Sequence, residues 1–464
     1  MGTARFPSQI KYIIGNEASE RFSFYGMRAI LVVFMTDVLM KERADAKAIY
    51  HLFNQGVYFL PLLGAFLADR VWGKYKTIFW LSLIYCLGHL TLAVWESEAG
   101  LYAGLALIAL GAGGIKPCVS SFVGDQFTTK EQAPLIERVY SIFYFSINFG
   151  AFFSSLLTPW LLVKYGSSVA FGLPGILMAL ATLILWAGRR QYVDVPPSGP
   201  NGPAGFVTVA WSALRAKSRS KSNDQPQFEG HWLDHARARH NALEVSGAKT
   251  AWGIFKVFAT VTVFWALFDQ QGSSWTLQAK QMDPEFLGMR WEASQIQALN
   301  PILVLILIPI FSGWVYPAFE RLGLKMTPLR KMSMGMALAS LSFVSIGMLQ
   351  FALDHGTKLS VGWQFIPYLI VTISEVMVSI PGLEFAYTQA PAHLKSTMMS
   401  FWMLTIALGN FLVAIIAKLN VFSGVGEFFF FAALMAIVAT VFMSSARKYR
   451  PVESAQALEP SPAN

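Results

Sequence analysis

Residues 76–95 read KTIFWLSLIYCLGHLTLAVW, a stretch in which Lys76 is the only formally charged residue. An α-helix needs about 20 mostly apolar residues to cross the hydrocarbon core of a bilayer, so this stretch predicts a membrane-spanning helix. The pattern recurs along the chain and gives twelve candidate spans. They cover residues 18–39, 49–70, 76–95, 100–123, 139–163, 169–188, 253–278, 294–317, 330–351, 362–387, 396–419 and 426–446.

The composition of the whole chain agrees with a membrane location. Of the 464 residues, 54% are hydrophobic and 14% are charged, whereas roughly 25% of residues are charged in average soluble proteins. A soluble fold would have to expose much of this apolar surface and would aggregate. We therefore expect an all-α membrane protein surrounded by a lipid bilayer and not a soluble enzyme.

Charge and cysteine content exclude several other classes of protein. The net charge of +9 fits cytoplasmic loops rich in Lys and Arg. Because no basic stripe accompanies a recognition fold, we expect no nucleic-acid partner. Cys86 and Cys118 lie in apolar runs and are expected to be small buried residues rather than a disulfide or a metal site. We expect neither a metal ion nor another cofactor. Residues 1–9 lack the apolar core of a signal peptide.

The positions of the basic residues predict the orientation of the spans. With an even number of spans, the segments before the first span, after the second, between the eighth and ninth and after the last lie on one side. Cytoplasmic segments carry an excess of Lys and Arg, so both termini are predicted to be cytoplasmic. The basic residues concerned are Arg5, Lys11, Arg70, Lys74, Lys76, Arg321, Lys325, Arg330, Lys331, Arg447, Lys448 and Arg450.

One polar stretch interrupts the spans and divides them six and six. We predict an N-terminal six-helix bundle in residues 1–188, a cytoplasmic linker in residues 189–250, a C-terminal six-helix bundle in residues 251–450 and a cytoplasmic tail in residues 451–464. Within the linker, residues 231–245 have an amphipathic, helix-like pattern, which predicts a helix lying along the membrane surface.

The two halves contain a weak internal repeat, ADRVWGK at residues 68–74 and FERLGLK at residues 319–325. Each copy places an acid–base pair and a glycine in a short cytoplasmic turn, where the glycine permits a tight backbone and the charges can pair across helices. Asp69, Arg70 and Gly73 are therefore predicted to have a gating or structural role. Two such halves predict alternating access to a substrate site between them, near the middle of the membrane.

Several charged residues fall inside the first predicted span or immediately before it. An ionisable residue at the bilayer centre costs at least about 2.5 kcal/mol on insertion scales, so such residues are functional candidates. Glu17 and Arg21 are four residues apart and share a helix face; Glu20 is adjacent, and Arg28 lies two turns beyond Arg21. The stripe from Glu17 to Arg28 spans about 16 Å of one helix. Snorkelling to the interface is the alternative for Glu17.

Charged and polar residues also occur inside other spans. Lys116 follows a glycine-rich segment, GAGGI at residues 111–115, that would let neighbouring helices approach closely. Glu375 lies near the middle of the tenth span. Asn148 and Asn300 lie in the fifth and eighth spans, where each could equally serve to join helices.

His51 and Asp269 form a further candidate pair, because each lies towards the outer end of its span. Matching depth makes a contact possible, and such a contact could exchange a proton near neutral pH. The alternative is an exposed histidine at the start of a helix.

At this point the sequence resembles the proton-coupled oligopeptide transporters of the major facilitator superfamily. Residues 17–28, EASERFSFYGMR, resemble the ExxERFxYYG signature of that family. The resemblance covers all twelve spans and implies the major facilitator fold, with two six-helix halves. Further matching segments are GGIKPCVSSFVGDQF at 113–127, FYFSINFG at 143–150, FWALFDQQG at 264–272, and the stretch from Glu375 to Tyr387 that contains GLEFAY at 382–387.

The resemblance implies an activity, which is the uptake of di- and tripeptides together with protons. It also implies roles for individual residues. The peptide carboxylate would be bound by Arg21 and Lys116, with Arg28 nearby, and the amino terminus by Glu375 with Asn148 and Asn300. The side-chain pockets would be shaped by Tyr25, Tyr58, Tyr144, Trp275 and Trp402. Proton coupling would involve Glu17, Glu20, His51 and Asp269.

Two alternatives to peptide symport are open at the level of sequence. One is proton-coupled uptake of nitrate or another small anion, as in plant relatives, which Arg21 and Lys116 would suit but Glu375 would oppose. The other is a membrane-embedded enzyme, for which no paired catalytic or metal-binding cluster is apparent. The long outer domain of animal members is absent from this sequence, so we expect a transporter of the bacterial inner membrane. We expect it to function as a monomer, with protons and short peptides as its partners.

Overall fold

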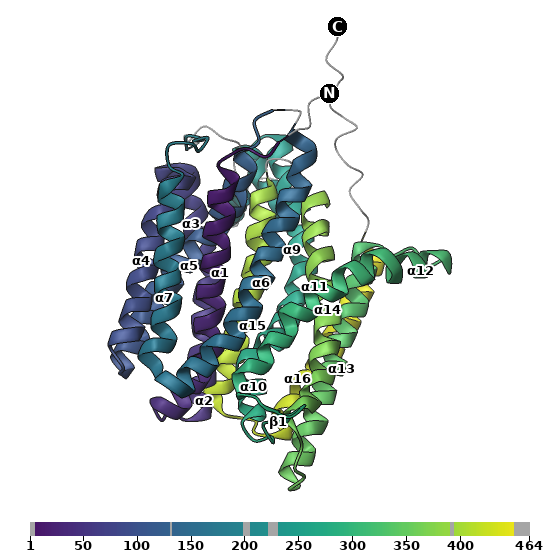
Figure 1. Cartoon of the computed structure of the whole chain (residues 1–464). Coiled ribbons are helices and arrows are strands. Elements are labelled where there is room, and N and C mark those ends of the chain that lie inside the picture. The colour runs from purple at the N-terminus through teal and green to yellow at the C-terminus, as the bar shows by residue number, and fades with distance from the viewer. Residues whose placement is uncertain (1–4, 130–131, 198–204, 221–230, 390–393, 450–464) are drawn as a thin grey trace.

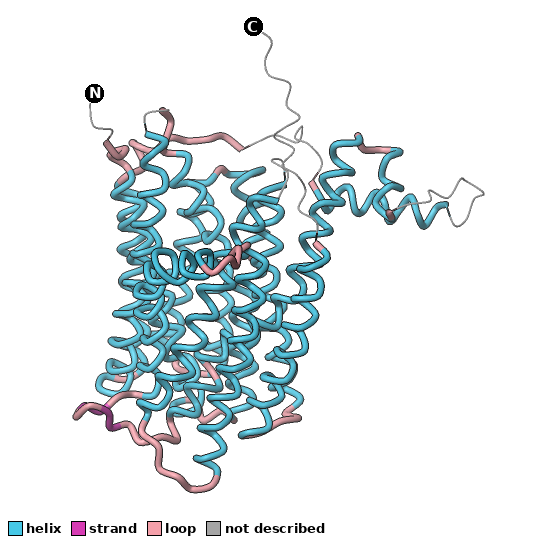
Figure 2. The backbone as a smooth tube through the Cα atoms, turned by 90° about the vertical axis from the view of Figure 1, so that its right-hand side faces the viewer, coloured by secondary structure: helices cyan, strands magenta, loops and turns pink. Residues whose placement is uncertain are grey.

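The computed structural model describes residues 5–129, 132–197, 205–220, 231–389 and 394–449. These residues form a bundle of long helices that run roughly parallel to one another, with a single short hairpin at one end (Figure 1). Figure 2 shows the same bundle from the side, where helix predominates and most of the loops lie at its two ends. The predicted all-α membrane architecture is confirmed.

The N-terminal half begins with α1 (Ile10–Val33), which ends in the short π-helical turn η1 (Phe34–Val38). The chain then returns as α2, α3 and η2. Its remaining helices are long and cross the bundle in turn. The bounds of these elements are α2 Arg43–Phe59, α3 Pro61–Phe66, η2 Leu67–Trp72, α4 Lys74–Val94, α5 Glu98–Asp125, α6 Ala133–Tyr165 and α7 Ser167–Ala187.

The C-terminal half repeats this arrangement with more interruptions. Its first long helix, α9 (Ala242–Phe268), is followed by two short helices and the hairpin of β1 (Glu285–Phe286) and β2 (Met289–Arg290). The other elements are η5 Asp269–Gly272, α10 Ser274–Ala279, η6 Ala293–Ala298, α11 Leu299–Ile310, η7 Phe311–Val315, α12 Tyr316–Arg321, α13 Pro328–Asp354, η8 Val361–Gln364, α14 Phe365–Gln389, α15 Lys395–Leu419 and α16 Val425–Lys448.

Ten helical segments of the described chain are long and apolar enough to cross a membrane. They correspond to the third to the twelfth predicted spans. The first two predicted spans, 18–39 and 49–70, are also helical, but they coincide with α1 and with the run from α2 to η2. These two segments are more polar because they carry the buried Glu17, Glu20 and His51, which the surrounding helices shield from lipid.

Each half has its own hydrophobic core. One cluster of buried side chains is built almost entirely from α1 to α7, and a second from α9 to α16. Tyr58 on α2 packs against both clusters, which places it where the halves meet. A carrier that works by the movement of two halves requires a separate hydrophobic core in each half.

We describe the two ends of the bundle by the course of α1. The near end is where α1 begins, and the far end is where α1 finishes and α2 begins. At the near end, Gly73 has φ of +81° in the turn between η2 and α4, a conformation that favours glycine. Lys74 follows it and forms an ion pair with Asp125 on α5 at 2.6 Å. The turn therefore joins neighbouring helices of the N-terminal half through Lys74, and the gating or structural roles of Asp69, Arg70 and Gly73 stay predictions.

The linker differs from its prediction. Residues 231–245 do not form one helix: His231 caps the short 3-10 helix η4 (Trp232–Ala238), the chain breaks, and Asn241 caps α9. The break falls there because Asn241 with Glu244 forms a capping box that starts a new helix. A helix absent from the prediction, α8 (Phe206–Ser220), lies earlier in the linker and packs against η4 and α9.

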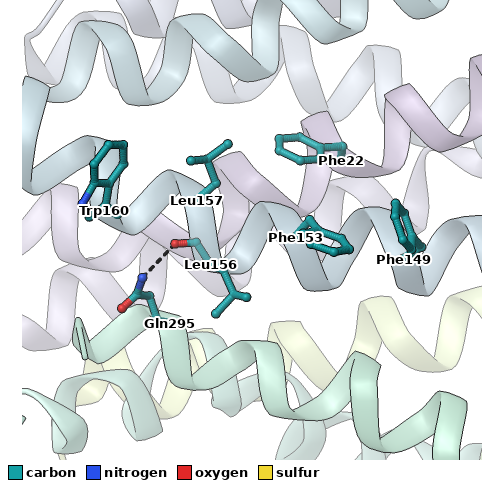
Figure 3. Close-up of a pocket in the computed structure, with 7 residues that line it drawn as sticks. All are labelled: Phe22, Phe149, Phe153, Leu156, Leu157, Trp160 and Gln295. Atoms are coloured by element: carbon teal, nitrogen blue, oxygen red, sulfur yellow. Dashed lines mark hydrogen bonds between the residues drawn. The ribbon is translucent and has the colours of Figure 1, made fainter. Parts of the chain in front are cut away.

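An apolar groove lies on the side of the bundle between the two halves. Its volume is about 710 Å³, and Figure 3 shows aromatic rings of α6 along it. Gln295 of η6 donates a hydrogen bond across the groove to the carbonyl oxygen of Leu156 on α6 at 2.8 Å. The lining residues are Phe22, Phe149, Phe153, Leu156, Leu157, Trp160 and Gln295. This surface is apolar enough to face lipid and is separate from the charged residues described next.

Candidate functional site

The predicted charged stripe on α1 forms a compact buried cluster. The Nε–H of Arg21 donates to Glu17 Oε1 at 2.6 Å, as their spacing of four residues predicts. Arg21 Nε also lies 3.0 Å from Glu20 Oε2. The side chains of Glu17 and Glu20 are almost completely buried. A buried cation beside two carboxylates is a site where uptake of one proton changes the partner of the arginine.

Lys116, which comes from α5, also belongs to this cluster. Its ammonium lies 4.2 Å from the ring centre of Phe24 and 5.2 Å from that of Tyr58. It also interacts electrostatically with Glu17, Glu20 and Arg21. The N-terminal half thus presents two cations, held by aromatic rings and carboxylates, to the space between the halves.

The glycines before Lys116 have the packing role expected from the sequence. A Cβ placed on Gly114 would lie 2.3 Å from Leu81 on α4, and one on Gly64 of α3 would lie 2.0 Å from the Gly114 carbonyl oxygen. At Gly64 only a residue without a side chain fits, because the opposing atoms belong to the backbone, whereas at Gly114 the Leu81 side chain would have to move. The close approach of α3, α4 and α5 fixes the end of α5 from which Lys116 projects.

Glu375 on α14 is the predicted anion of the C-terminal half. Asn300 of α11 donates from Nδ2 to Glu375 Oε2 at 2.7 Å and to the Thr372 hydroxyl at 3.2 Å, so the two predicted residues are in direct contact. Glu375 also interacts with Tyr25 and Tyr144 of the N-terminal half. The carboxylate therefore faces the half that carries the two cations.

The structure does not bring the remaining predicted substrate residues to one place. Asn148 donates to the Tyr144 carbonyl oxygen on its own helix at 3.0 Å and not, as predicted, to Glu375. Trp275 is fully buried in the C-terminal core, with its ring edge-to-face on Tyr368. Trp402 is also a core residue and packs on Phe258 and Trp265. The role of Asn148 in binding the amino terminus and the roles of Trp275 and Trp402 in shaping side-chain pockets stay predictions.

Arg28 is engaged away from the carboxylate-binding cluster. Its guanidinium donates from NH2 to Asp269 Oδ1 at 2.9 Å and from Nε to the Tyr50 hydroxyl at 2.8 Å. Asp269 belongs to η5 of the C-terminal half, so this contact joins the two halves. In this conformation Arg28 therefore belongs to a contact between the halves. Its predicted position beside Arg21 and Lys116, near a peptide carboxylate, stays a prediction.

The predicted contact between His51 and Asp269 runs through a third residue. Asn410 on α15 bonds His51 Nδ1 through its Oδ1 at 2.8 Å and donates from Nδ2 to Asp269 Oδ2 at 2.6 Å. The other ring nitrogen of His51 bonds the Ser273 hydroxyl at 2.8 Å. His51 is completely buried, so the alternative of an exposed histidine is wrong.

Ion pairs across the halves gather at the far end. Within the described residues, four pairs join the N-terminal half to the C-terminal half, and all of them lie towards the far end of the bundle. They are Arg28–Asp269, Lys47–Glu427, Lys418–Asp45 and Lys280–Asp37. The structure is thus closed at the far end.

The sequence did not single out three residues that the structure places in this network. Asn410 and Ser273 bond His51, and Tyr50 bonds Arg28. Each is an uncharged polar residue, so no unusual cost of burial marked it in advance. A signal existed for Asn410, since it interrupts the apolar span 396–419 as Asn148 and Asn300 interrupt theirs.

Two packed halves with a charged site between them define a membrane carrier of the major facilitator fold. Comparison with known proteins gives the family: the model of the POT family (PTR2) matches residues 75–426. The chain belongs to this family, whose members are transporters and not enzymes.

Curated relatives and solved structures agree with this assignment. Peptide transporter 3 of Caenorhabditis elegans is 39% identical over 75% of this chain, which spans about half (52%) of that longer protein. Solute carrier family 15 member 2 of Mus musculus is 28% identical over 97% of this chain and 90% of its own length. The crystal structure of the POT family transporter PepTSo is 42% identical, covers 96% of this chain and 99% of its own, and has a TM-score of 0.88.

A second solved structure, described as an auto-inhibited POT family peptide transporter, is 40% identical. It covers 98% of this chain and 99% of its own, with a TM-score of 0.87. Both structures match this chain over nearly their whole length, so these two solved members of the family share its overall arrangement.

Proposed function

We propose that this protein takes up di- and tripeptides together with protons by alternating access. The observation that carries the proposal is the placement of opposite charges on opposite halves. Arg21 and Lys116 come from the N-terminal half, whereas Glu375 with Asn300 comes from the C-terminal half. A short peptide has one negative and one positive end whatever its side chains, so it can bridge the two halves.

The site suggests how a proton would be coupled to the peptide. In this conformation Arg21 is paired with Glu17 and lies beside Glu20. A proton on one of these carboxylates would weaken its hold on the guanidinium and free Arg21 to bind the peptide carboxylate. Loss of that proton on the other side would restore the pair and expel the peptide. The coupling therefore follows from competition between two anions for one arginine.

The closed far end suggests which way the site opens. If both termini are cytoplasmic, as the distribution of Lys and Arg favours, the far end is the outer face. The four ion pairs across the halves at that end then correspond to a carrier shut towards the outside. Uptake would begin when these pairs break and the halves part at the far end.

The same reasoning supports the finer assignments. A bacterial inner membrane fits the short loop at residues 355–360 between α13 and η8, and a monomer contains both sides of the proposed site. Peptides are favoured over nitrate because a buried Glu375 facing the site would repel a small anion. Two of the relatives reported above, the Caenorhabditis elegans protein and the auto-inhibited solved structure, are described as peptide transporters.

Uptake of labelled dialanine into liposomes that contain the purified protein tests the proposal. An inward proton gradient is expected to accelerate uptake over liposomes without a gradient. Equal rates with and without the gradient would remove proton coupling. Competition by nitrate with the same strength as unlabelled dialanine would remove the peptide assignment instead.

His51 requires a separate test, because its buried network could serve closure of the far end alone. A His51→Asn variant keeps a side chain able to bond Asn410 or Ser273 but cannot take up a proton. A shift in the pH dependence of uptake is expected if His51 belongs to the proton path. An unchanged pH profile would assign His51 to the contact between the halves only.

A further inference from the structure

A second polar surface lies inside the N-terminal half, on the side of α1 that carries Glu20. Three polar residues of α1 and three of α4 follow helical spacing, so each set forms one face. All six side chains are at most 1% exposed. We name this surface the α1–α4 polar seam; it consists of Asn16, Glu20 and Ser23 on α1 and Ser82, Tyr85 and His89 on α4.

The two faces touch at the outer end of the seam. The Ser23 hydroxyl and His89 Nε2 are 2.9 Å apart and form a hydrogen bond. The rings of Tyr85 and His89 stack with their centres 5.0 Å apart and an angle of 20° between their planes. Gly175 of α7 lies against His89, because a Cβ on this glycine would be 3.0 Å from that of the histidine. Position and orientation of the imidazole are therefore fixed by three helices.

Glu20 connects the seam to the proposed coupling site. It lies close to Glu17, Arg21 and Lys116 on one side and to the Tyr85 hydroxyl on the other, but the Tyr85 hydroxyl makes no direct hydrogen bond with it. Arg21 Nε is 3.0 Å from Glu20, but its single N–H is directed at Glu17. Both Glu20 oxygens consequently lack a hydrogen-bond donor among the protein groups.

Unpartnered polar atoms are concentrated in this seam. Buried polar atoms in proteins almost always have a partner, which is ordered water where no protein group can serve. Apart from Glu20, four of the seam residues contribute an atom without a protein partner. These atoms are Asn16 Oδ1, Ser82 Oγ, the Tyr85 hydroxyl and His89 Nδ1. The seam residues as a set extend over seven residues along each helix, from Asn16 to Ser23 and from Ser82 to His89, or about 10 Å.

We propose that the α1–α4 polar seam holds ordered water and forms a proton path between His89 and Glu20. The proposal rests on the proton coupling proposed above and adds a route to it. The path lies between α1 and α4, inside the N-terminal half, whereas Arg21 and Lys116 face the proposed substrate site between the halves. A proton could thus reach Glu20 while a peptide occupies the space between the halves.

The proton step uses only the seam residues and the ordered water that we propose between them. A proton added at His89 Nδ1 lets the ring lose the one on Nε2 towards Ser23, so the imidazole stays neutral and changes only its tautomer. Water and the Tyr85 hydroxyl pass the proton on, and the Glu20 carboxylate receives it and becomes neutral. The groups that face His89 are Ser23, Tyr85 and the Gly175 backbone.

The test compares two seam variants with a matched control. Tyr85→Phe removes one hydroxyl, and His89→Gln keeps a side chain that can bond Ser23 and water but cannot take up a proton. Cys86→Ala removes a polar atom from the same helix outside the seam, where Cys86 contacts Thr182. Each protein is placed in liposomes, and two rates are measured with labelled dialanine: uptake driven by a proton gradient, and exchange against unlabelled dialanine without a gradient.

Both seam variants are expected to lose about tenfold in gradient-driven uptake, equivalent to ~1.4 kcal/mol in the barrier of the proton step. Their exchange rates and both rates of Cys86→Ala should match those of the unmodified protein. If gradient-driven uptake of the seam variants equals that of Cys86→Ala, the proposal is overturned. A parallel loss of uptake and exchange also overturns it, because that result indicates a structural role.

An infrared titration keeps the test independent of transport. The carboxylic acid band that disappears in Glu20→Gln is followed against pH in the unmodified protein and in Tyr85→Phe. If Tyr85 and Glu20 belong to one path, the midpoint pH of the Glu20 band shifts when the Tyr85 hydroxyl is removed. An unchanged midpoint would contradict the proposed path. If the unmodified protein shows no gradient-driven uptake at all, the proposed function fails, and this titration still decides whether the seam exists.

Discussion

Arg28 on α1 and Asp269 on η5 are 241 residues apart in the chain and 2.9 Å apart in the structure. Their side chains are 12% and 3% exposed, and Tyr50 and Asn410 bond the two charged groups from either side. Removing one member of a buried pair costs about 3–5 kcal/mol because the other charge is left without a partner. The pair therefore contributes strongly to closure of the far end.

Asp269→Asn is expected to open the far end. Spin labels at Val94 and Val421, which are exposed on the N-terminal and C-terminal halves, would report the distance between the halves in a protein whose two cysteines have been replaced. We expect a population at longer distance that is absent or small in the unmodified protein. Electron paramagnetic resonance distance measurement in liposomes checks this.

The control for this experiment is Asp45→Asn. Asp45 pairs with Lys418 across the same end, but these side chains are 43% and 71% exposed, and such pairs contribute little. Its distance distribution should match that of the unmodified protein. If Asp269→Asn and Asp45→Asn give the same distribution, the buried pair does not hold the far end shut.

Glu375→Gln should weaken binding of peptides with a free amino terminus. The substitution preserves the contact with Asn300 but removes the negative charge, and a charge-assisted hydrogen bond contributes about 1.5–3 kcal/mol, which corresponds to roughly ten- to hundredfold in affinity. Dialanine binding can be measured by calorimetry. The same variant should bind N-acetylated dialanine as the unmodified protein does. An equal loss for both ligands would place Glu375 outside the amine site.

The charged residues could be located from the sequence because a charge within an apolar span is costly wherever it lies. Their partners could not. The spacing of Glu17 and Arg21 gave one contact correctly, since both lie on the same helix. The contact of Arg28 depends on a residue in the other half, and no helical periodicity reports how two halves are placed relative to each other.

Glu20→Gln should separate proton coupling from peptide exchange. The amide has the size of the carboxylic acid but cannot release a proton, so the carrier would behave as if permanently protonated. Gradient-driven uptake of dialanine should be lost, and exchange between compartments should continue at a rate near that of the unmodified protein. Loss of both activities would instead assign Glu20 to folding or to substrate binding.

Asp234 in the linker should stabilise η4 in a pH-dependent way. A hydrogen bond from Lys249 Nζ at 2.7 Å lowers the pKa of Asp234, against the effect of its burial. Because the folded-state pKa lies below the ordinary value of about 3.9, this stabilisation is present above that pH and is lost as the pH falls through the folded-state pKa. At neutral pH, Asp234→Asn should speed hydrogen exchange in residues 232–238 about fivefold, for a contribution of ~1 kcal/mol.

The matched control in the linker is Arg237→Gln. Arg237 also pairs with Asp234, at 2.9 Å, but is 57% exposed, so its removal should leave exchange in η4 nearly unchanged. Equal acceleration in both variants would show that the Lys249 bond has no special role. A change in Asp234→Asn of the same size at pH 3 as at pH 7 would contradict the assigned pKa direction.

The linker also shows where sequence patterns are weakest. Residues 231–245 contain apolar residues at helical spacing, yet a capping box at Asn241 and Glu244 starts a new helix inside that stretch. The helix α8 was overlooked because its face with Val209 and Ala213 is buried only by contact with η4 and α9. A short helix stabilised by neighbours leaves a faint pattern, whereas twenty apolar residues in a row leave a clear one.

The central claim is that peptide and proton move together through one carrier. Liposomes containing the purified protein and a trapped pH-sensitive dye, in weak buffer and without an imposed proton gradient, test it most directly. When dialanine is added outside, proton-coupled uptake should make the interior of the liposomes more acidic. Liposomes that contain Glu20→Gln should show no such change. Entry of labelled dialanine without acidification in the unmodified protein would contradict proton-coupled transport.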